Sequence, residues 1–582
     1  MTRVLHLAMF FFFSIWSSSA EVIHVTSQRD FDKLNETINI SLKKGMRDIY
    51  IHFSKGTYYY NNSHIDLAGK DYPDANIHII GNGSECVAKG RMYLSRQDYD
   101  EAFPFDHTFL DEKKHVVDTW TSFFLLDELV EVVSKERKLC RVKDLSGVKT
   151  VSSSGSYIQI TSWYQSFVYR IEKIENGYIY FSADNLGKGY NEGWNVNNDY
   201  SYGKQYPRYR LCNVVLNEEP LSVDKGKMCF REVIGPIYEC QSTRFLVLGY
   251  GTRLSSVEVA DISFIGNVYD GELGLFSLLS PQGSVIIRDC SFTGMSSSRV
   301  ISVGNKNKVS VLNCRFEDCA ESCVISGQGT NNTIVQYCEF KRCGTALKNS
   351  FCVRCFGANY YIGHNTFEDY GYSAIGLGMG SGNVQRNEIY GVAEYNTLRY
   401  TDDYLANIEQ HTLMDSGAIY VSTINDNAII RYNVIDGYSG MSDNRGIFCD
   451  DGAKNLKIYR NVITNIKNSY CIDSRRVSTV EAQSGASNIG NVIYDNIIDG
   501  SLRFAGRESS NNGCEYGTNY ILVPKDGLAP IVAVSNVTKT GKDVVLERKG
   551  ATNGRTAVSR SSYKTIKKVL GREEVKKVFV RK

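Results

Sequence analysis

A short pattern returns at a nearly fixed interval from Asp261 onward. Its first copies read V-I-I-R-D-C-S-F from Val285, V-S-V-L-N-C-R-F from Val309 and T-I-V-Q-Y-C-E-F from Thr333. Later copies begin at Tyr361, Asn383, Ile429, Lys457 and Val492. One anchor position in each copy carries Cys or Asn, and these anchors are Cys290, Cys314, Cys338, Asn365, Asn387, Asn433, Asn461 and Asn496. A period of this kind predicts a repeat architecture in which each copy occupies an equivalent place.

Each copy alternates apolar and polar residues, which is typical of a half-buried strand and not of a helix. Gly, Asn or Asp follows each copy, and about two dozen residues suffice for one coil of three short strands. The predicted fold is all-β, a right-handed parallel β-helix solenoid with the anchor side chains pointing inward. A buried Asn needs hydrogen-bond partners, so we expect the anchors to bond the backbone and one another. The longer steps, Asn387 to Asn433 and Asn461 to Asn496, predict loops that leave the solenoid.

The remaining segments predict an N-terminal capping helix and a β-rich insertion. Ser27 can N-cap a helix that places Phe31, Leu34, Ile38 and Leu42 on one face and ends at Gly45. Between Val116 and Cys240 the repeat is interrupted by other strand-like stretches. The predicted division of the chain is 1–20 signal peptide, 21–115 N-terminal cap and first coils, 116–240 β-rich insertion, 241–525 parallel β-helix and 526–582 C-terminal extension.

The first residues have the composition of a secretory signal peptide. Arg3 precedes the apolar run from Leu5 to Trp16, and Ser18-Ser19-Ala20 offers small residues for cleavage. We therefore expect a secreted, periplasmic or cell-surface protein without a membrane span. The formal net charge is only +2, which gives no indication of a nucleic-acid partner. A monomer that binds a polysaccharide or oligosaccharide is expected.

Sixteen cysteines in a secreted chain usually indicate disulfides, but their spacing here favours another interpretation. Cys290, Cys314 and Cys338 recur every 24 residues, and Cys319 and Cys343 repeat that step. Equivalent slots in successive repeats predict buried, mostly unpaired thiols stacked along the core. Cys352 and Cys355 form a lone C-x-x-C, which is a weak zinc signal without a second pair, so no metal site is predicted.

The densest polar chemistry lies between Glu394 and Arg476. If Ile447 and Cys449 point inward, Phe448 and Asp450 point outward, and Asp473 follows Asp450 by 23 residues, as if stacked one coil on. Paired carboxylates suit glycoside hydrolysis, in which one protonates the leaving oxygen and the other attacks or activates water. The candidate catalytic residues are Asp415, Asp450, Asp451 and Asp473, and the candidate substrate-binding residues are Arg445, Tyr420, His411, Arg475 and Glu409. The alternative is that Asp450-Asp451-Gly452 only ends a strand.

The segment from Asp415 to Asn461 carries a resemblance. Its runs D-S-G-A-I-Y, I-I-R-Y-N-V-I, R-G-I-F-C-D-D-G and I-Y-R-N-V-I resemble those of the β-helix enzymes of glycoside hydrolase family 141. That family includes fucosidases and xylanases, and a β-rich module interrupts its early coils. Here Lys138 to Lys143 and Tyr209 to Leu216 take the corresponding place, without the Ala-Arg-x-Pro and Gly-Glu-Trp-Tyr-like segments. The resemblance implies a secreted polysaccharide-degrading glycoside hydrolase.

Other pairings and other functions remain open. By the 28-residue step from Asn433 to Asn461, Asp415 is equivalent to Asp443, so it begins a strand while Asp450 ends one. Acids of a covering loop from Glu394 to Gln410 are further partners, namely Glu394, Asp402, Asp403 and Glu409, with His411 near. A polysaccharide lyase would instead use Arg445, Arg475, Arg476 or Lys467 against a uronate and hold Ca²⁺ with Asp450, Asp451 and Asp473. A non-catalytic glycan-binding protein is the third alternative. No cofactor is expected for the hydrolase.

Overall fold

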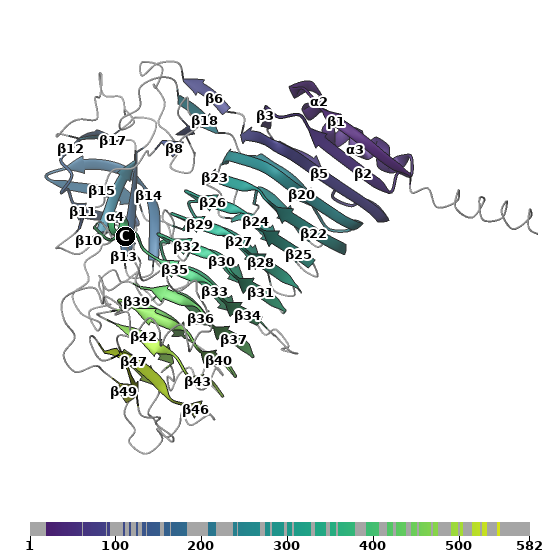
Figure 1. The fold of residues 1–582 in the computed structure, drawn as a ribbon. Helices are drawn as coiled ribbons and strands as arrows, with labels where there is room; N and C mark the ends of the chain where they lie inside the picture. Colours follow the sequence, from purple (N-terminus) through teal and green to yellow (C-terminus); the bar gives the residue numbers. More distant parts are fainter. Residues whose placement is uncertain are drawn as a thin grey trace, which may run out of the picture.

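The computed structural model describes residues 19–93 except 61 and 89, and parts of 109–182, 208–216 and 237–267. It also describes residues 274–378, 391–406, 416–474, 490–504, 515–531 and 544–546, with short gaps. The described residues form a right-handed parallel β-helix, seen as a ladder of stacked strands (Figure 1). A 24-stranded sheet and a 12-stranded sheet contain its coils. We call them sheet A and sheet B.

Each full coil contributes two strands to sheet A and one to sheet B, and each strand pairs in parallel with its equivalent one coil on. The first strands are β22 (Gln282–Arg288), β25 (Lys308–Leu312), β28 (Thr333–Gln336), β31 (Tyr360–Gly363), β34 (Gly391–Glu394), β37 (Ala428–Arg431), β40 (Lys457–Tyr459), β43 (Val492–Tyr494) and β46 (Glu515–Tyr516). The second strands are β23 (Ser291–Met295), β26 (Arg315–Glu317), β29 (Glu339–Lys341), β32 (Thr366–Glu368), β35 (Thr397–Arg399), β38 (Val434–Asp436), β41 (Val462–Thr464), β44 (Ile497–Ile498) and β47 (Asn519–Val523).

Sheet B forms a separate wall of the solenoid. In spatial order it contains β4 (Asn62–Asp66), β19 (Thr243–Leu248), β21 (Phe276–Leu278), β24 (Arg299–Val303), β27 (Ser322–Ser326), β30 (Phe351–Cys355), β33 (Ser373–Gly378), β36 (Ser416–Ser422), β39 (Asn444–Cys449), β42 (Tyr470–Ser474), β45 (Ser501–Phe504) and β49 (Val544–Leu546). The last pairing, between β45 and β49, is antiparallel, so the parallel ladder of this sheet ends at β45.

A sharp bend separates the two sheet-A strands of each coil. The residue before each anchor has a positive φ, for example Tyr337 (φ 57), His364 (φ 59) and Tyr432 (φ 54). A left-handed conformation is costly for residues other than Gly. The anchor side chain that follows turns inward and bonds the backbone of neighbouring coils, which holds the bend in place.

The predicted inward column of anchors is confirmed at every position but one. Cys290, Cys314, Cys338, Asn365, Asn433, Asn461 and Asn496 are all buried. Backbone N–H groups donate to the next anchor along the column, as from Asn433 to Asn461 Oδ1 at 3.1 Å and from Asn461 to Asn496 Oδ1 at 3.0 Å. Asn519 continues this ladder beyond Asn496.

Asn387 was the wrong anchor. Asn396 takes its place, because the backbone N–H of Asn365 donates to Asn396 Oδ1 at 3.1 Å and that of Asn396 donates to Asn433 Oδ1 at 3.1 Å. The copy that enters the solenoid is therefore Gly391–Leu398, formed by β34 and β35. The segment from Asn383 to Asn387 lies outside the described residues.

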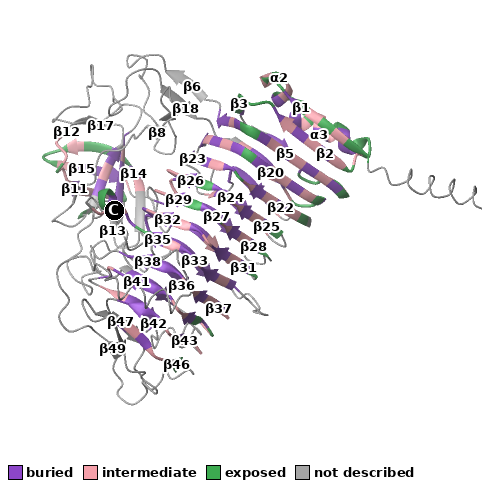
Figure 2. Ribbon diagram, viewed as in Figure 1, coloured by how far each residue is buried: buried purple, intermediate pink, exposed green. Residues whose placement is uncertain are grey.

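The core is a continuous apolar column inside the coils (Figure 2). Successive rings of Phe292, Phe316, Phe340 and Phe367 stack with centroids 4.7–4.8 Å apart. This spacing is the separation of neighbouring strands, so the same side chain repeats in register. The predicted thiols Cys290, Cys314, Cys319, Cys338 and Cys343 are buried and form no disulfide.

The N-terminal helix is present in two pieces, α2 (Gln28–Asp32) and α3 (Leu34–Lys43). Ser27 caps the first piece by accepting a hydrogen bond from the Asp30 N–H, and the predicted apolar face is buried. Both pieces lie at the N-terminal end of the solenoid (Figure 1), beside β1 (Ala20–Val25), β2 (Asp48–Phe53), β3 (Thr57–Tyr60) and β5 (Asp71–Ala88). No helix in the described part of the chain is long and apolar enough to cross a bilayer. Nearly all of the predicted signal peptide lies outside the described residues.

The coils on either side of the interrupted region are direct neighbours, since β5 pairs in parallel with β20 (Arg253–Asn267). The chain between them forms antiparallel strands beside the solenoid (Figure 1). These are β6 (Gly90–Tyr93), β7 (Phe109–Leu110), β8 (Val116–Val117), β9 (Phe124–Leu125), β10 (Glu131–Ser134), β11 (Leu139–Lys143), β12 (Val148–Val151), β13 (Tyr157–Ser162), β14 (Gln165–Glu175), β15 (Tyr178–Ser182), β16 (Arg208–Cys212), β17 (Val214–Leu216) and β18 (Ile237–Cys240). At the other end, β48 (Gly527–Ile531) pairs antiparallel with β47.

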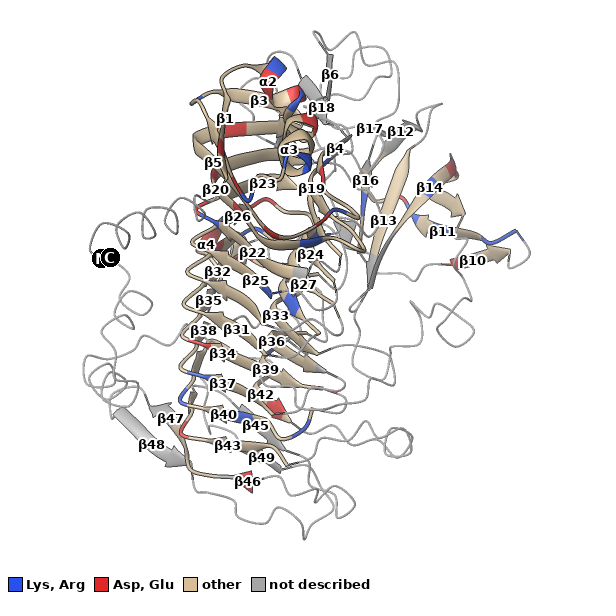
Figure 3. Cartoon of the chain, turned by 90° about the vertical axis from the view of Figure 1, so that its right-hand side faces the viewer, with Lys and Arg blue, Asp and Glu red and all other residues tan. Residues whose placement is uncertain are grey.

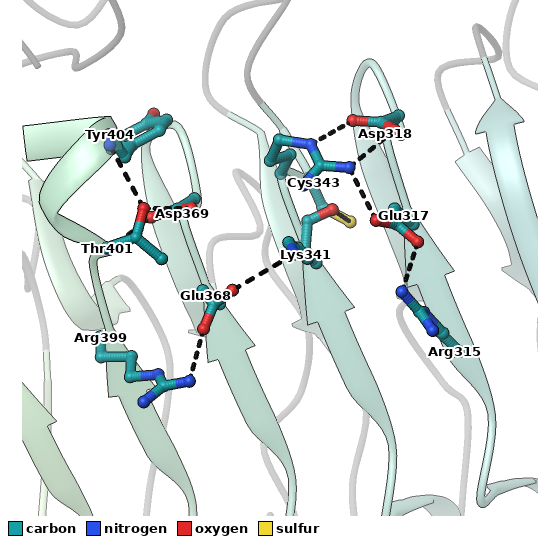
Figure 4. Close-up of polar contacts among 11 residues, drawn as sticks. Arg315, Glu317, Asp318, Lys341, Cys343, Glu368, Asp369, Arg399, Thr401 and Tyr404 are labelled. Atoms are coloured by element: carbon teal, nitrogen blue, oxygen red, sulfur yellow. Dashed lines mark hydrogen bonds and ion pairs between the residues drawn. The ribbon is translucent and has the colours of Figure 1, made fainter. Parts of the chain in front are cut away.

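Charged side chains of both signs are spread along the solenoid (Figure 3), in keeping with the small net charge. Along the second strands of sheet A they form a ladder of ion pairs. Arg342 bonds Glu317 at 2.7 Å and Asp318 at 2.6 Å, and Arg399 bonds Glu368 at 2.6 Å (Figure 4). Because the arginine side chains of these ion pairs are partly exposed to solvent, each pair contributes little to stability.

Candidate functional site

The predicted acids lie on sheet B, where β36, β39 and β42 are successive neighbours. Their register places Tyr420 beside Phe448 and Phe448 beside Asp473. The predicted stacking of Asp473 on Asp450 is therefore wrong, because Asp473 stacks on Phe448. Asp450 directly follows β39, two residues beyond Phe448 and one coil before Asp473.

Asp473 is held by a buried cation. Arg445 Nε donates to Asp473 Oδ2 at 2.9 Å, and their side chains are only 4% and 1% exposed. The Arg445 guanidinium also lies over the Phe448 ring, 3.8 Å from its centroid. A carboxylate this deeply buried is stable as an ion only with such a partner. Arg445 therefore holds the Asp473 carboxyl group in place.

Asp450 has a different neighbour. The Tyr420 hydroxyl forms a short hydrogen bond to Asp450 Oδ2, and the Asp450 N–H donates to the Val421 carbonyl at 2.7 Å. Both side chains are buried. The carboxyl group is thus oriented by the strand that precedes it, and it is not the mobile end of a surface turn.

Aromatic rings link the two acidic groups. Tyr420 and Phe448 meet edge to face at 5.0 Å, and together with Phe351 and Tyr372 they form a small buried cluster on sheet B. Arg354 lies over Phe351 at 5.1 Å. Burial lowers the pKa of the Arg354 guanidinium to about 10, and the positive charge of Arg299 acts in the same direction. Positive charge therefore lies at both ends of the aromatic cluster, from Arg354 and Arg445.

The separation of the two carboxyl groups follows from sheet geometry. A displacement of two residues along the strand and one strand across corresponds to about 8 Å between Cα atoms. The two glycosidase mechanisms use characteristic carboxyl separations, about 5 Å for retention and 6.5–9.5 Å for inversion. Asp450 and Asp473 lie on adjacent coils, and a catalytic pair requires their carboxyl groups to fall within one of these ranges.

Other predicted members of the site do not join it. Glu394, predicted in a covering loop, lies on β34 of sheet A, where it bonds Arg431 at 2.5 Å and Tyr361 at 3.2 Å. Asp402 and Asp403 begin the short helix α4 (Asp402–Ala406). Thr401 anchors this helix to Asp369 of the preceding coil, at 2.7 and 2.8 Å (Figure 4).

Several predicted residues lie outside the described part of the chain, namely Asp415, Asp451, His411, Glu409, Arg475, Arg476 and Lys467. The register beside Asp415 is nevertheless visible. Ser416 pairs with Asn444, and β39 ends at Cys449. β36 begins at Ser416, while Asp450 directly follows β39.

Sequence reasoning missed Arg354 and Tyr372, which contact the aromatic cluster beside Tyr420. Arg354 aligns with Gly376, and Gly376 with Tyr420, in one column of sheet B. The repeat pattern was recognised on sheet A, where the anchors are. Sheet B strands follow loops of varying length, so their register has no comparable signal in the sequence.

No family model matches the sequence, and no curated protein is significantly similar to it. Among solved structures, one described as a glycoside hydrolase matches with a TM-score of 0.47 and 13% identity, over 80% of this chain and 98% of that chain. XylC with xylose matches with a TM-score of 0.37 and 10% identity, over 82% and 86%. The catalytic domain of a GH87 α-1,3-glucanase in complex with nigerose matches with a TM-score of 0.28 and 10% identity, over 71% and 92%. Likenesses this distant establish neither a shared family nor a shared activity.

Proposed function

We propose that the protein is a secreted glycoside hydrolase that cleaves a complex glycan on the outer face of sheet B. The observation that carries this proposal is the arrangement of Asp450 and Asp473. Two buried carboxyl groups occupy diagonal positions on neighbouring strands, each held by a different side chain. The resemblance of Asp415–Asn461 to glycoside hydrolase family 141 supports the same chemistry.

The two groups have different environments, as paired-carboxylate catalysis requires. The ion pair with Arg445 favours the charged form of Asp473, which suits a base or a nucleophile. Asp450, which the Tyr420 hydroxyl holds in place, is then assigned the complementary role of donating a proton to the leaving oxygen. In this scheme Tyr420 and Arg445 are positioning residues, and Arg354 binds substrate hydroxyl or carboxylate groups.

A Ca²⁺-dependent lyase is the second candidate. It needs carboxylates free to surround the cation, but Asp473 is already neutralised by Arg445. Among the residues that the structure describes, the carboxylates form no group of three suited to a metal ion. Arg354 and Arg445 favour an anionic substrate, which is compatible with either reaction, so the chemistry of the product distinguishes them.

The test uses three single variants of the full chain and a panel of plant and host polysaccharides. Reducing-end release is measured first with the unmodified protein. Asp450→Asn should then lower turnover by about 10²–10⁴-fold, which is the usual contribution of a general acid or base. Tyr420→Phe should lower it by roughly tenfold, because one hydrogen bond to the acid is lost.

Asp436→Asn is the matched control. Asp436 is also buried, at 9% exposure, but it lies on β38 of sheet A. Its variant should keep turnover close to that of the unmodified protein. Wild-type turnover in Asp450→Asn would overturn the assignment, and a glycan that binds without being cleaved would favour the non-catalytic alternative.

A further inference from the structure

Four thiols meet at one inner corner of the solenoid. Cys319 and Cys343 follow the bends that end β26 and β29, while Cys323 and Cys352 lie on the neighbouring sheet-B strands β27 and β30. The sulfur atoms of Cys319, Cys323 and Cys343 all lie within 4.8 Å of one another. Cys352 also hydrogen-bonds to Cys343. All four side chains are buried.

This cluster differs from the other column of thiols. Cys290, Cys314 and Cys338 form a single file, and each donates to a backbone carbonyl of the previous coil, at 3.8, 3.6 and 3.5 Å. These three cysteines occupy the anchor positions that asparagine occupies in later coils. In the corner cluster, by contrast, side chains from two columns converge across the interior on the Cys343 sulfur.

We propose that Cys319, Cys323, Cys343 and Cys352 form a structural binding site for one thiophilic metal ion, with Zn²⁺ as the best fit. Zinc–thiolate bonds of about 2.3 Å correspond to sulfur atoms about 3.8 Å apart in a tetrahedral site. For three sulfur atoms within 4.8 Å of one another, some point lies no more than about 2.8 Å from all three. Side-chain shifts of roughly half an ångström per thiol therefore bring these three sulfur atoms to zinc–thiolate distance. Cys352, which hydrogen-bonds to Cys343, is the proposed fourth ligand.

Burial and mutual hydrogen bonds shift the pKa values of the four thiols in different directions. Burial raises the pKa of the Cys319, Cys323 and Cys352 thiols. The pKa of Cys343 is instead held well below its ordinary value, since burial is outweighed by hydrogen bonds from the other three thiols to its sulfur. Metal coordination requires thiolates, so binding by all four sulfur atoms releases the thiol protons.

The surroundings indicate a closed site that is filled during folding. Met295 lies one coil before Cys319, as the pairing of Thr293 with Glu317 requires, and it is fully buried. Tyr370, which is also buried, lies one coil after Cys343. On the outer surface Arg342 joins Asp318, so the residues directly before Cys343 and Cys319 are bonded to each other (Figure 4). Because the ion is enclosed, its loss should accompany unfolding.

The test measures metal bound to the full chain. Protein folded in the presence of Zn²⁺ and then dialysed against a weak chelator should retain about one zinc per chain, by elemental analysis. Folding with Co²⁺ instead should give the visible absorption of a tetrahedral thiolate site. Cys343→Ser should lower zinc retention at least tenfold. Cys314→Ser, which removes a buried thiol from the single file, should leave it unchanged.

If Cys343→Ser does not fold, the Co²⁺ spectrum and the zinc content of the unmodified chain still test the proposal. Folded protein without retained zinc and without a thiolate–cobalt spectrum would overturn the proposal. Disulfides among these four cysteines, found by mass analysis of the unmodified chain, would overturn it as well. Equal zinc retention in Cys343→Ser and the unmodified protein would do the same.

Discussion

Replacing one member of the asparagine ladder tests what holds the coils together. Asn433 bridges three coils. Its amide nitrogen donates to the Ala393 carbonyl at 2.9 Å, and its amide oxygen accepts from the Asn396 backbone N–H at 3.1 Å. Asn433→Ala removes both partners inside the buried core. Each buried polar group left unsatisfied costs about 1–3 kcal/mol, so we expect a loss of about 4 kcal/mol.

Hydrogen exchange followed by mass spectrometry locates this loss. Since 1.4 kcal/mol is a factor of ten, exchange in the peptide containing Asn396 should accelerate by about 10³-fold where opening is local. Asn433→Cys is the matched variant, because the chain itself uses Cys at equivalent positions and the Cys314 N–H donates to Cys338 Sγ at 3.5 Å. It should lose clearly less stability than Asn433→Ala. A loss below about 1 kcal/mol in Asn433→Ala, or equal losses in the two variants, would refute the ladder as a major source of stability.

Three further predictions concern titration, ion pairing and packing. Burial lowers the pKa of the His64 imidazole to about 4 in the folded protein, so on acidification the unfolded chain is protonated at this residue before the folded one is. The free energy of unfolding measured in urea should therefore be highest above about pH 6.5 and decrease by up to about 3 kcal/mol towards pH 4. His64→Phe should remove this dependence, and an unchanged pH profile would contradict it. Arg445→Met and Asp473→Asn should each lower the free energy of unfolding in denaturant by about 3–5 kcal/mol, and the double variant should lower it by less than the sum of the two. Losses that simply add in the double variant would argue against the ion pair. Phe316→Ala should cost about 3–5 kcal/mol and Phe316→Leu much less, whereas equal costs would argue against ring stacking as the source.

The fold could be predicted because each repeat carries the same sequence pattern for one coil. Apolar alternation gives the strands, and the anchor position gives the inward bend. The error at Asn387 has a simple cause. The segments around Asn387 and Asn396 carry similar patterns, R-N-E-I and Y-N-T-L, and only stacking against Asn365 and Asn433 distinguishes them.

The candidate site was harder to predict because it lies on sheet B. A repeat step of 23 residues placed Asp473 beside Asp450. The coil between β39 and β42 is two residues longer than this step, so Asp473 pairs with Phe448 instead. The thiol cluster was missed for a related reason. Its members come from two coils and from both sides of a corner, so the spacing between Cys323, Cys343 and Cys352 follows loop lengths. Only Cys319 and Cys323 have the short C-x₃-C spacing of many metal ligands.

The product of the reaction tests the central claim most directly. The unmodified protein and Asp450→Asn are incubated with the glycan that gives most product, in water enriched in ¹⁸O. A paired-carboxylate hydrolase places one ¹⁸O at each new reducing end, and this label should appear with the unmodified protein and be nearly absent with Asp450→Asn. Unsaturated products without label would establish a lyase and contradict the account, as would labelled products formed equally by both proteins.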